Sequence, residues 1–98
     1  MEEICYAPLS GSKRLSLQEV ASLFTKAGLP CTIEPEGENM FWLVFNGSES
    51  NILASVESGA FVFGTFNYGP DDPVNVVEKV EEVMQSIGFS SEEGADYE

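Results

Sequence analysis

The sequence predicts an α+β protein of two layers, in which an antiparallel meander sheet of four to five strands has two helices on one of its faces. Two segments, 17–27 and 73–87, repeat apolar residues at helical spacing. Between them, short β-type runs are separated by turns that contain glycine. The chain has 98 residues and is 43% hydrophobic, which is the size and composition of one globular domain.

The first helix is predicted from its N-terminal cap. A short strand at 4–9 and a polar loop at 10–14 precede it. Ser16-Leu17-Gln18-Glu19 matches a capping box, in which the serine hydroxyl and the glutamate each satisfy a free backbone N–H. Gly28 is expected to end the helix. The apolar face consists of Leu17, Val20, Ala21, Phe24 and Ala27.

Four strands are expected between the helices, at 31–33, 40–45, 52–56 and 60–68. The turns that join them are the segment 35–38, Asn46-Gly47 and Ser58-Gly59. The run 40–45 is apolar on both faces, with Met40, Trp42 and Val44 on one and Phe41, Leu43 and Phe45 on the other.

The second helix is predicted to begin at Asp72-Pro73, with the aspartate as cap and proline in the first helical position. Gly88-Phe89 is expected to stop it. We therefore predict a single domain over 1–89 and an acidic disordered tail over 90–98. The apolar stripe of the helix consists of Val76, Val77, Val80, Val83, Met84 and Ile87.

The order of these elements resembles the type III secretion chaperone-like fold, which includes the bacterial sensory-transduction-regulator proteins. The resemblance covers about residues 16–87: a helix ending in Ala27-Gly28-Leu29, a β meander, then residues 61–66 leading into a valine-rich helix. It implies a non-enzymatic, often dimeric protein that binds protein partners. The chain departs from the pattern where further strands normally follow or separate the later helices, and the resemblance implies no individual functional residue.

The residues that most catalysis requires are missing. There is no histidine, and therefore no Ser-His or Cys-His nucleophile pair and no histidine metal ligand. Glycine-rich phosphate-binding motifs are also absent. Two cysteines are too few for a disulfide scaffold, so we expect reduced thiols. We predict a protein that is not an enzyme, binds no metal or cofactor, does not enter membranes, and acts in the cytoplasm, or the host cytoplasm if phage-encoded.

Charge gives the leading functional hypothesis. Seventeen acidic residues and four basic ones leave a net charge of −13, which repels nucleic acids and attracts a protein with a basic surface. In composition the chain resembles small acidic phage inhibitors that mimic DNA. We predict a non-enzymatic inhibitor that occupies the nucleic-acid-binding surface of its target; the alternative is that the acids only solubilise the fold and cap a helix. The acidic candidates are Glu34, Glu36, Glu38, Asp71, Asp72, Glu78, Glu81 and Glu82.

The alternative function uses an apolar sheet face. Two helices cover only one face of an antiparallel sheet, and the other is normally polar. Since both faces of the run 40–45 are apolar, one of them is either covered by another segment or is an interface. This favours a small chaperone or adaptor, as a homodimer or with a client protein, that binds through Phe41, Leu43 and Phe45.

Overall fold

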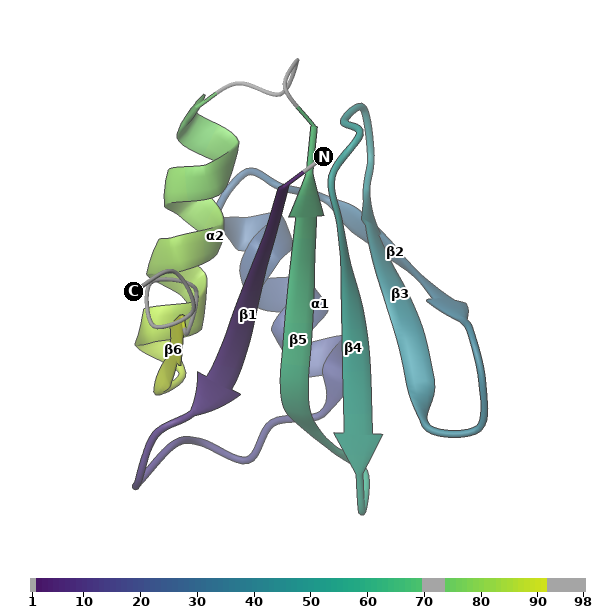
Figure 1. Cartoon of the computed structure of the whole chain (residues 1–98), viewed down its shortest axis with the longest axis vertical. Coiled ribbons are helices and arrows are strands. Elements are labelled where there is room, and N and C mark those ends of the chain that lie inside the picture. The colour runs from purple at the N-terminus through teal and green to yellow at the C-terminus, as the bar shows by residue number, and fades with distance from the viewer. Residues whose placement is uncertain (1, 70–73, 92–98) are drawn as a thin grey trace.

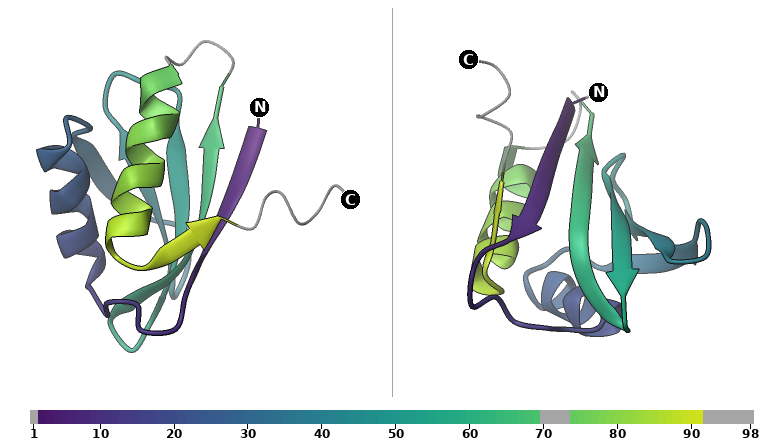
Figure 2. Two further views of the ribbon diagram at one scale, coloured as in Figure 1. Left: turned by 90° about the vertical axis from the view of Figure 1, so that its left-hand side faces the viewer. Right: turned by 60° about the horizontal axis from the view of Figure 1, so that its bottom comes forward.

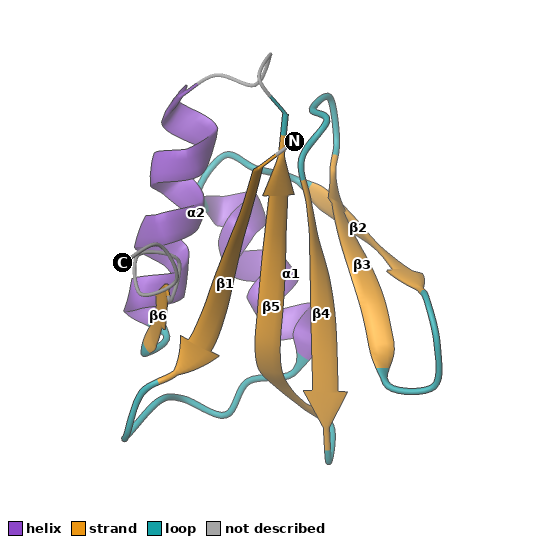
Figure 3. Cartoon of the chain, in the orientation of Figure 1, coloured by secondary structure: helices purple, strands orange, loops and turns teal. Residues whose placement is uncertain are grey.

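The computed structural model describes residues 2–69 and 74–91, and it has the predicted two-layer α+β architecture (Figures 1 and 3). Six strands form one antiparallel sheet in the order β2-β3-β4-β5-β1-β6, one strand more than the highest number expected. The elements in chain order are β1 (Glu2–Pro8), α1 (Leu17–Lys26), β2 (Cys31–Pro35), β3 (Met40–Phe45), β4 (Asn51–Glu57), β5 (Ala60–Tyr68), α2 (Val74–Ser86) and β6 (Phe89–Ser91).

Both helices lie on the same side of the sheet (Figure 2). The predicted capping box begins α1: Ser16 Oγ accepts from the Glu19 N–H at 3.2 Å, and the Glu19 carboxylate accepts from the Ser16 N–H at 2.8 Å. Helix α1 packs against β2 and β5, whereas α2 packs beside β6 at the other end of the sheet. Neither helix in the described residues has the length and hydrophobicity needed to cross a bilayer.

The core lies between the sheet and the helices. Aromatic rings fill its centre: Phe45 meets Phe24 of α1 at 5.1 Å and Phe66 of β5 at 6.3 Å, both edge to face. Such pairs add to the stabilisation that burial alone provides. From the strands the core takes Ile4, Tyr6, Leu43, Phe45, Ile52, Ala54, Phe61, Phe66 and Phe89, and from the helices Leu17, Val20, Phe24, Val76, Val80, Val83 and Met84.

The end of the chain differs from the prediction. Residues Phe89–Ser91 form β6, which pairs with β1, so the predicted tail loses its first two residues to the sheet. Gly88, with φ +88°, lets the chain turn sharply out of α2, and Phe89 then stacks on Phe61 at 5.0 Å. The predicted cap at Asp72-Pro73 and the rest of the predicted tail, 92–98, lie outside the described residues.

A β-bulge changes the face of one aromatic side chain. The register between β4 and β5 shifts after Ser55, which pairs with Phe63, so that Val56 pairs with Phe61. Because the bulge inserts one residue, Phe61 points into the core while Phe63 points away from the helices. Without the bulge, residues two apart on one strand would share a face.

Candidate protein-binding face of the sheet

Within residues 2–69 and 74–91, one face of the sheet has no helix over it. Its side chains follow from the register: Trp42 of β3 lies opposite Leu53 of β4, which lies opposite Thr65 of β5, which lies opposite Cys5 of β1. Residues directly opposite one another share a face. We call this surface the open face; it comprises Glu3, Cys5, Thr32, Glu34, Met40, Trp42, Val44, Asn51, Leu53, Ser55, Phe63, Thr65 and Asn67.

The middle of the open face is hydrophobic. We call the five side chains there the apolar centre, and all of them are half-buried although none belongs to the core. They come from three adjacent strands, and the Ser55 hydroxyl, between two of them, donates to the sulfur of Met40 at 3.2 Å. A solvent-facing sheet surface is normally polar, so this cluster is the unusual feature of the fold. The apolar centre consists of Met40, Trp42, Val44, Leu53 and Phe63.

Polar side chains border the apolar centre. At one end of the strands, Asn67 donates from its side-chain amide to Asn51 at 2.9 Å, and Thr32 donates to Asn46 at 3.3 Å. These hydrogen bonds satisfy polar side chains that border the apolar centre at this end of the strands. Exposed Glu3 of β1 lies on the same face beyond Asn67, its cross-strand partner.

Two carboxylates lie next to Trp42. Glu34 of β2 is its direct cross-strand partner on the open face, and its side chain is exposed. Glu36, in the turn after β2, accepts a hydrogen bond from the indole Nε1–H at 2.7 Å. The turn is closed by the N–H groups of Glu36 and Gly37, which both donate to the carbonyl of Met40 at 2.9 and 3.1 Å.

The structure divides the predicted acidic residues into separate groups. Glu34, Glu36 and Glu38 belong to β2 and the turn after it, at one edge of the sheet. Glu78, Glu81 and Glu82 belong to α2, which packs beside β6 at the other edge (Figure 1). The remaining two, Asp71 and Asp72, lie outside the described residues.

The acids of α2 also differ among themselves. Glu78 and Glu82 are exposed, but Glu81 is half-buried and takes part in the packing of the helix on the sheet. Its carboxylate accepts from the hydroxyl of buried Tyr6 at 2.6 Å and from the side chain of Gln85 at 2.8 Å. Glu81 is therefore a structural residue that joins α2 to β1.

The apolar residues chosen from the sequence are on the other face. Leu43 and Phe45 are 0% and 1% exposed beneath the helices, and half-buried Phe41 packs against the same core. This trio is therefore not an available surface. The sequence permitted either face of β3, and the neighbouring strands decide between them, because buried Ile52 pairs with Leu43 and buried Ala54 pairs with Phe41.

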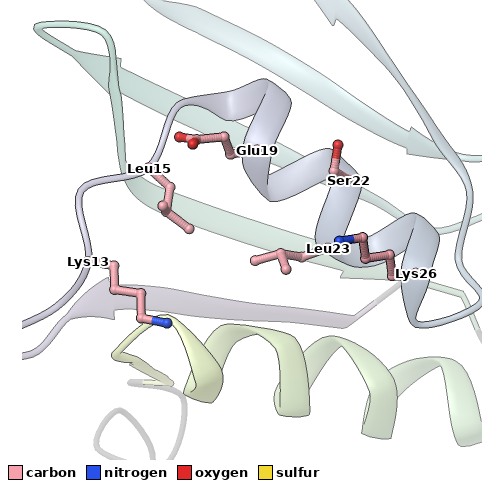
Figure 4. Close-up of a pocket in the computed structure, with 6 residues that line it drawn as sticks. All are labelled: Lys13, Leu15, Glu19, Ser22, Leu23 and Lys26. Atoms are coloured by element: carbon pink, nitrogen blue, oxygen red, sulfur yellow. The ribbon is translucent and has the colours of Figure 1, made fainter.

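The four basic residues lie away from the strands. Lys13 and Arg14 are in the loop before α1, Lys26 is in the last turn of α1, and Lys79 is in α2. Lys13 and Lys26 line an open groove of about 320 Å³ beside α1, with the half-buried side chains of Leu15 and Leu23 between them (Figure 4). All four basic residues therefore lie outside the strands, in or next to the helices, which also carry acidic residues.

The two thiols are far apart. Three strands separate β1, with Cys5, from β2, with Cys31, so about 19 Å of sheet lies between them and a disulfide is excluded. Burial raises the pKa of the Cys31 thiol, which donates to the carbonyl of Ala21 at 3.8 Å. Cys5 lies on the open face beside the Thr65 hydroxyl, at 4.0 Å.

Sequence reasoning missed Leu53 and Phe63 as surface residues, and it considered Trp42 only as one of two alternatives. The signal for Leu53 was its alternation with Ile52 and Ala54 on β4. Among the described residues, no three His, Cys, Asp or Glu side chains gather in a way that could hold a metal ion.

The arrangement offers a hydrophobic patch with carboxylates at one side, which is suited to contact with another macromolecule. No family model, no curated protein and no solved structure matches the chain. The resemblances to the type III secretion chaperone-like fold and to acidic phage inhibitors therefore stay predictions, and the surface of the molecule is the basis for any functional proposal.

Proposed function

We propose that this protein is a non-enzymatic binding module that docks, through the open face, onto a protein whose apolar surface is bordered by lysine and arginine. The observation behind the proposal is the apolar centre, which the helices leave uncovered and which has Glu34 and Glu36 beside Trp42. Glu3 lies on the same face beyond Asn67. Protein interfaces commonly combine a hydrophobic core, enriched in aromatic residues and methionine, with a polar rim.

Charge complementarity identifies the kind of partner. None of the six strands in the described part of the chain contains a lysine or arginine, and the chain has a net charge of −13. A basic partner would be attracted over distances comparable to the Debye length, and the hydrophobic contact would then form at short range. A second copy of this chain is a poorer occupant, because a symmetric dimer through the open face would bring the same carboxylates toward one another.

Nucleic-acid mimicry is the second candidate, and the net charge of −13 supports it. A mimic needs its carboxylates on one continuous surface that follows a basic groove. The six described candidates instead belong to opposite edges of the sheet, three near β2 and three on α2. The open face therefore has the stronger support.

Matched leucine variants test the proposal. Leu53→Asp puts a charge into the apolar centre, and Leu9→Asp makes the same change at a leucine that is 56% exposed in the loop after β1. We expect proteins captured from lysate by the immobilised full chain at moderate salt to be lost with Leu53→Asp and kept with Leu9→Asp. Circular dichroism of both variants verifies that they are folded.

Other outcomes point elsewhere. Capture that survives Leu53→Asp but disappears with Glu78→Gln/Glu82→Gln, or that duplex DNA competes away, would refute docking through the open face and support mimicry. If the protein has the mass of a dimer in solution and Leu53→Asp lowers that mass to the mass of a monomer, the open face binds a second copy of this chain.

A further inference from the structure

Trp42 is the only tryptophan of the chain and lies in the apolar centre, next to two carboxylates. We propose that the indole ring of Trp42, with the carboxylates of Glu36 and Glu34, binds one arginine side chain of the partner. The inference rests on the proposed function, because it assigns the partner a particular residue at this point of the interface.

The hydrogen bond to Glu36 defines the geometry of the site. The indole N–H lies in the plane of the ring, so an acceptor 2.7 Å from Nε1 lies close to that plane. Glu36 therefore sits at the edge of the ring and does not cover its faces. The bond also restricts rotation of the half-buried indole, so that the ring is held in place before a ligand arrives.

A cation on the ring face would meet favourable charge from two directions. The negative face of an indole attracts cations more strongly than any other side-chain ring. The Glu36 carboxylate at the ring edge keeps lone pairs for further donors, since two carboxylate oxygens accept about four hydrogen bonds. Exposed Glu34, directly across the strand pair, adds a second negative group on the same face.

Arginine fits this site better than lysine. Its guanidinium is planar, so it can stack on the indole while its N–H groups, which lie in the guanidinium plane, point outward to carboxylates at the ring edge. An ammonium is compact and strongly hydrated, and it would give up more hydration to enter the apolar centre. Met40 and Val44, two residues before and after Trp42 on the same face, make the surroundings apolar.

The single tryptophan makes the site directly observable. The probes are the peptide acetyl-Gly-Leu-Arg-Leu-Gly-amide and the same peptide with lysine or citrulline in place of arginine. Binding is followed by Trp42 fluorescence and by the one indole N–H signal in a nitrogen–proton NMR spectrum. We expect the arginine peptide to move both signals, with an affinity at least threefold above the lysine peptide and tenfold above the citrulline peptide.

A conservative variant separates this site from general charge attraction. Glu36→Gln retains an oxygen that can accept from the indole N–H but removes the charge, whereas Glu78→Gln removes one charge from an exposed position on α2. We expect Glu36→Gln to weaken the arginine peptide about tenfold and Glu78→Gln to leave its affinity unchanged. Equal weakening by both variants, or equal affinity for arginine and lysine peptides, would overturn the inference.

Failure of this inference is distinguishable from failure of the proposed function. If Leu53→Asp abolishes capture of the partner while the peptides show no arginine preference, the open face is the docking surface but Trp42 is not an arginine site. If Leu53→Asp leaves capture intact, the proposed function fails, and this inference fails with it.

Discussion

Replacing Leu43 with alanine tests which face of the sheet holds the core, because Leu53, on the adjacent strand and the opposite face, allows the same substitution. Leu43 is 0% exposed and lies against Ile33 and Ile52 of the neighbouring strands. The change removes three carbon groups, which is about 2.4 kcal/mol at ~0.8 kcal/mol each. The cavity left beneath the helices increases the expected loss to about 3–4 kcal/mol.

Leu53→Ala removes the same atoms from the half-buried open face. Solvent can fill the space, so no cavity remains, and we expect a loss of about 1 kcal/mol. Urea unfolding followed by circular dichroism measures both values. A domain of this size has a free energy of unfolding of about 5–15 kcal/mol, so both variants are expected to fold.

The denaturation midpoints of the two variants separate a buried face from an exposed one. With a urea dependence of roughly 1–3 kcal/mol per molar, Leu43→Ala is expected to lower the midpoint three to four times as much as Leu53→Ala, about 1–4 M against about 0.3–1 M. Equal losses, or a larger loss for Leu53→Ala, would mean that the open face is covered in solution and that its assignment as a docking surface is wrong.

Three further predictions concern the glycine turn, the helix cap and the thiol. Gly88→Ala adds a Cβ 2.7 Å from Ser12 Cα at a φ of +88°, whereas the Cβ added by Gly59→Ala, at a similar φ of +80°, meets no atom within 4 Å. In thermal unfolding we therefore expect Gly88→Ala to lower the melting temperature more than Gly59→Ala. Equal shifts would contradict a steric role of the contact with Ser12. Ser16→Ala removes the acceptor for the Glu19 N–H and is expected to destabilise the protein by about 1 kcal/mol, lowering the melting temperature by roughly 4–8 °C; no shift would mean that the cap is dispensable. In a Cys5→Ser background, Cys31 should react with iodoacetamide more slowly in the folded protein than in urea near neutral pH, because burial raises its pKa and reduces the thiolate fraction; equal rates would refute this. The same shift means that the stability contributed by the buried thiol is lost as the pH rises past its ordinary pKa of 9.0, where the unfolded chain gives up its proton first.

Local signals predicted most of the fold. The Ser16 capping box and the apolar periodicity after it gave a first helix at 17–27, against Leu17–Lys26 in the structure. Turn dipeptides such as Asn46-Gly47 separated the strands correctly, because their backbone preferences act over only a few residues. Two helices and a run of hairpins then left few arrangements other than a two-layer sandwich.

Non-local pairing accounts for what was missed. Strand β6 has three residues, and its partner β1 lies at the other end of the chain, so nothing within Phe89–Ser91 signals a strand. The bulge that separates Phe61 from Phe63 likewise appears only when β4 and β5 are paired. Both features depend on a second segment that local patterns do not identify.

The candidate site was predictable only in part. That one apolar face of β3 would point away from the helices followed from its composition, and whether another segment covers that face stayed open. The choice between the two faces required the neighbouring strands. The bond from Trp42 to Glu36 depends on the turn between β2 and β3, which places residues six apart in contact. The acidic candidates could be read from the sequence, but their division between two edges of the sheet could not.

The sheet edge formed by β2 affects the tendency of the protein to self-associate. A free edge strand presents unpaired backbone groups to which another chain can add, and this is a common beginning of aggregation. Here the strand is only five residues long, ends in Pro35, which has no N–H to donate, and has exposed Glu34 beside that proline. Growth of the sheet by strand addition is thus discouraged at β2, the edge nearest to the apolar centre.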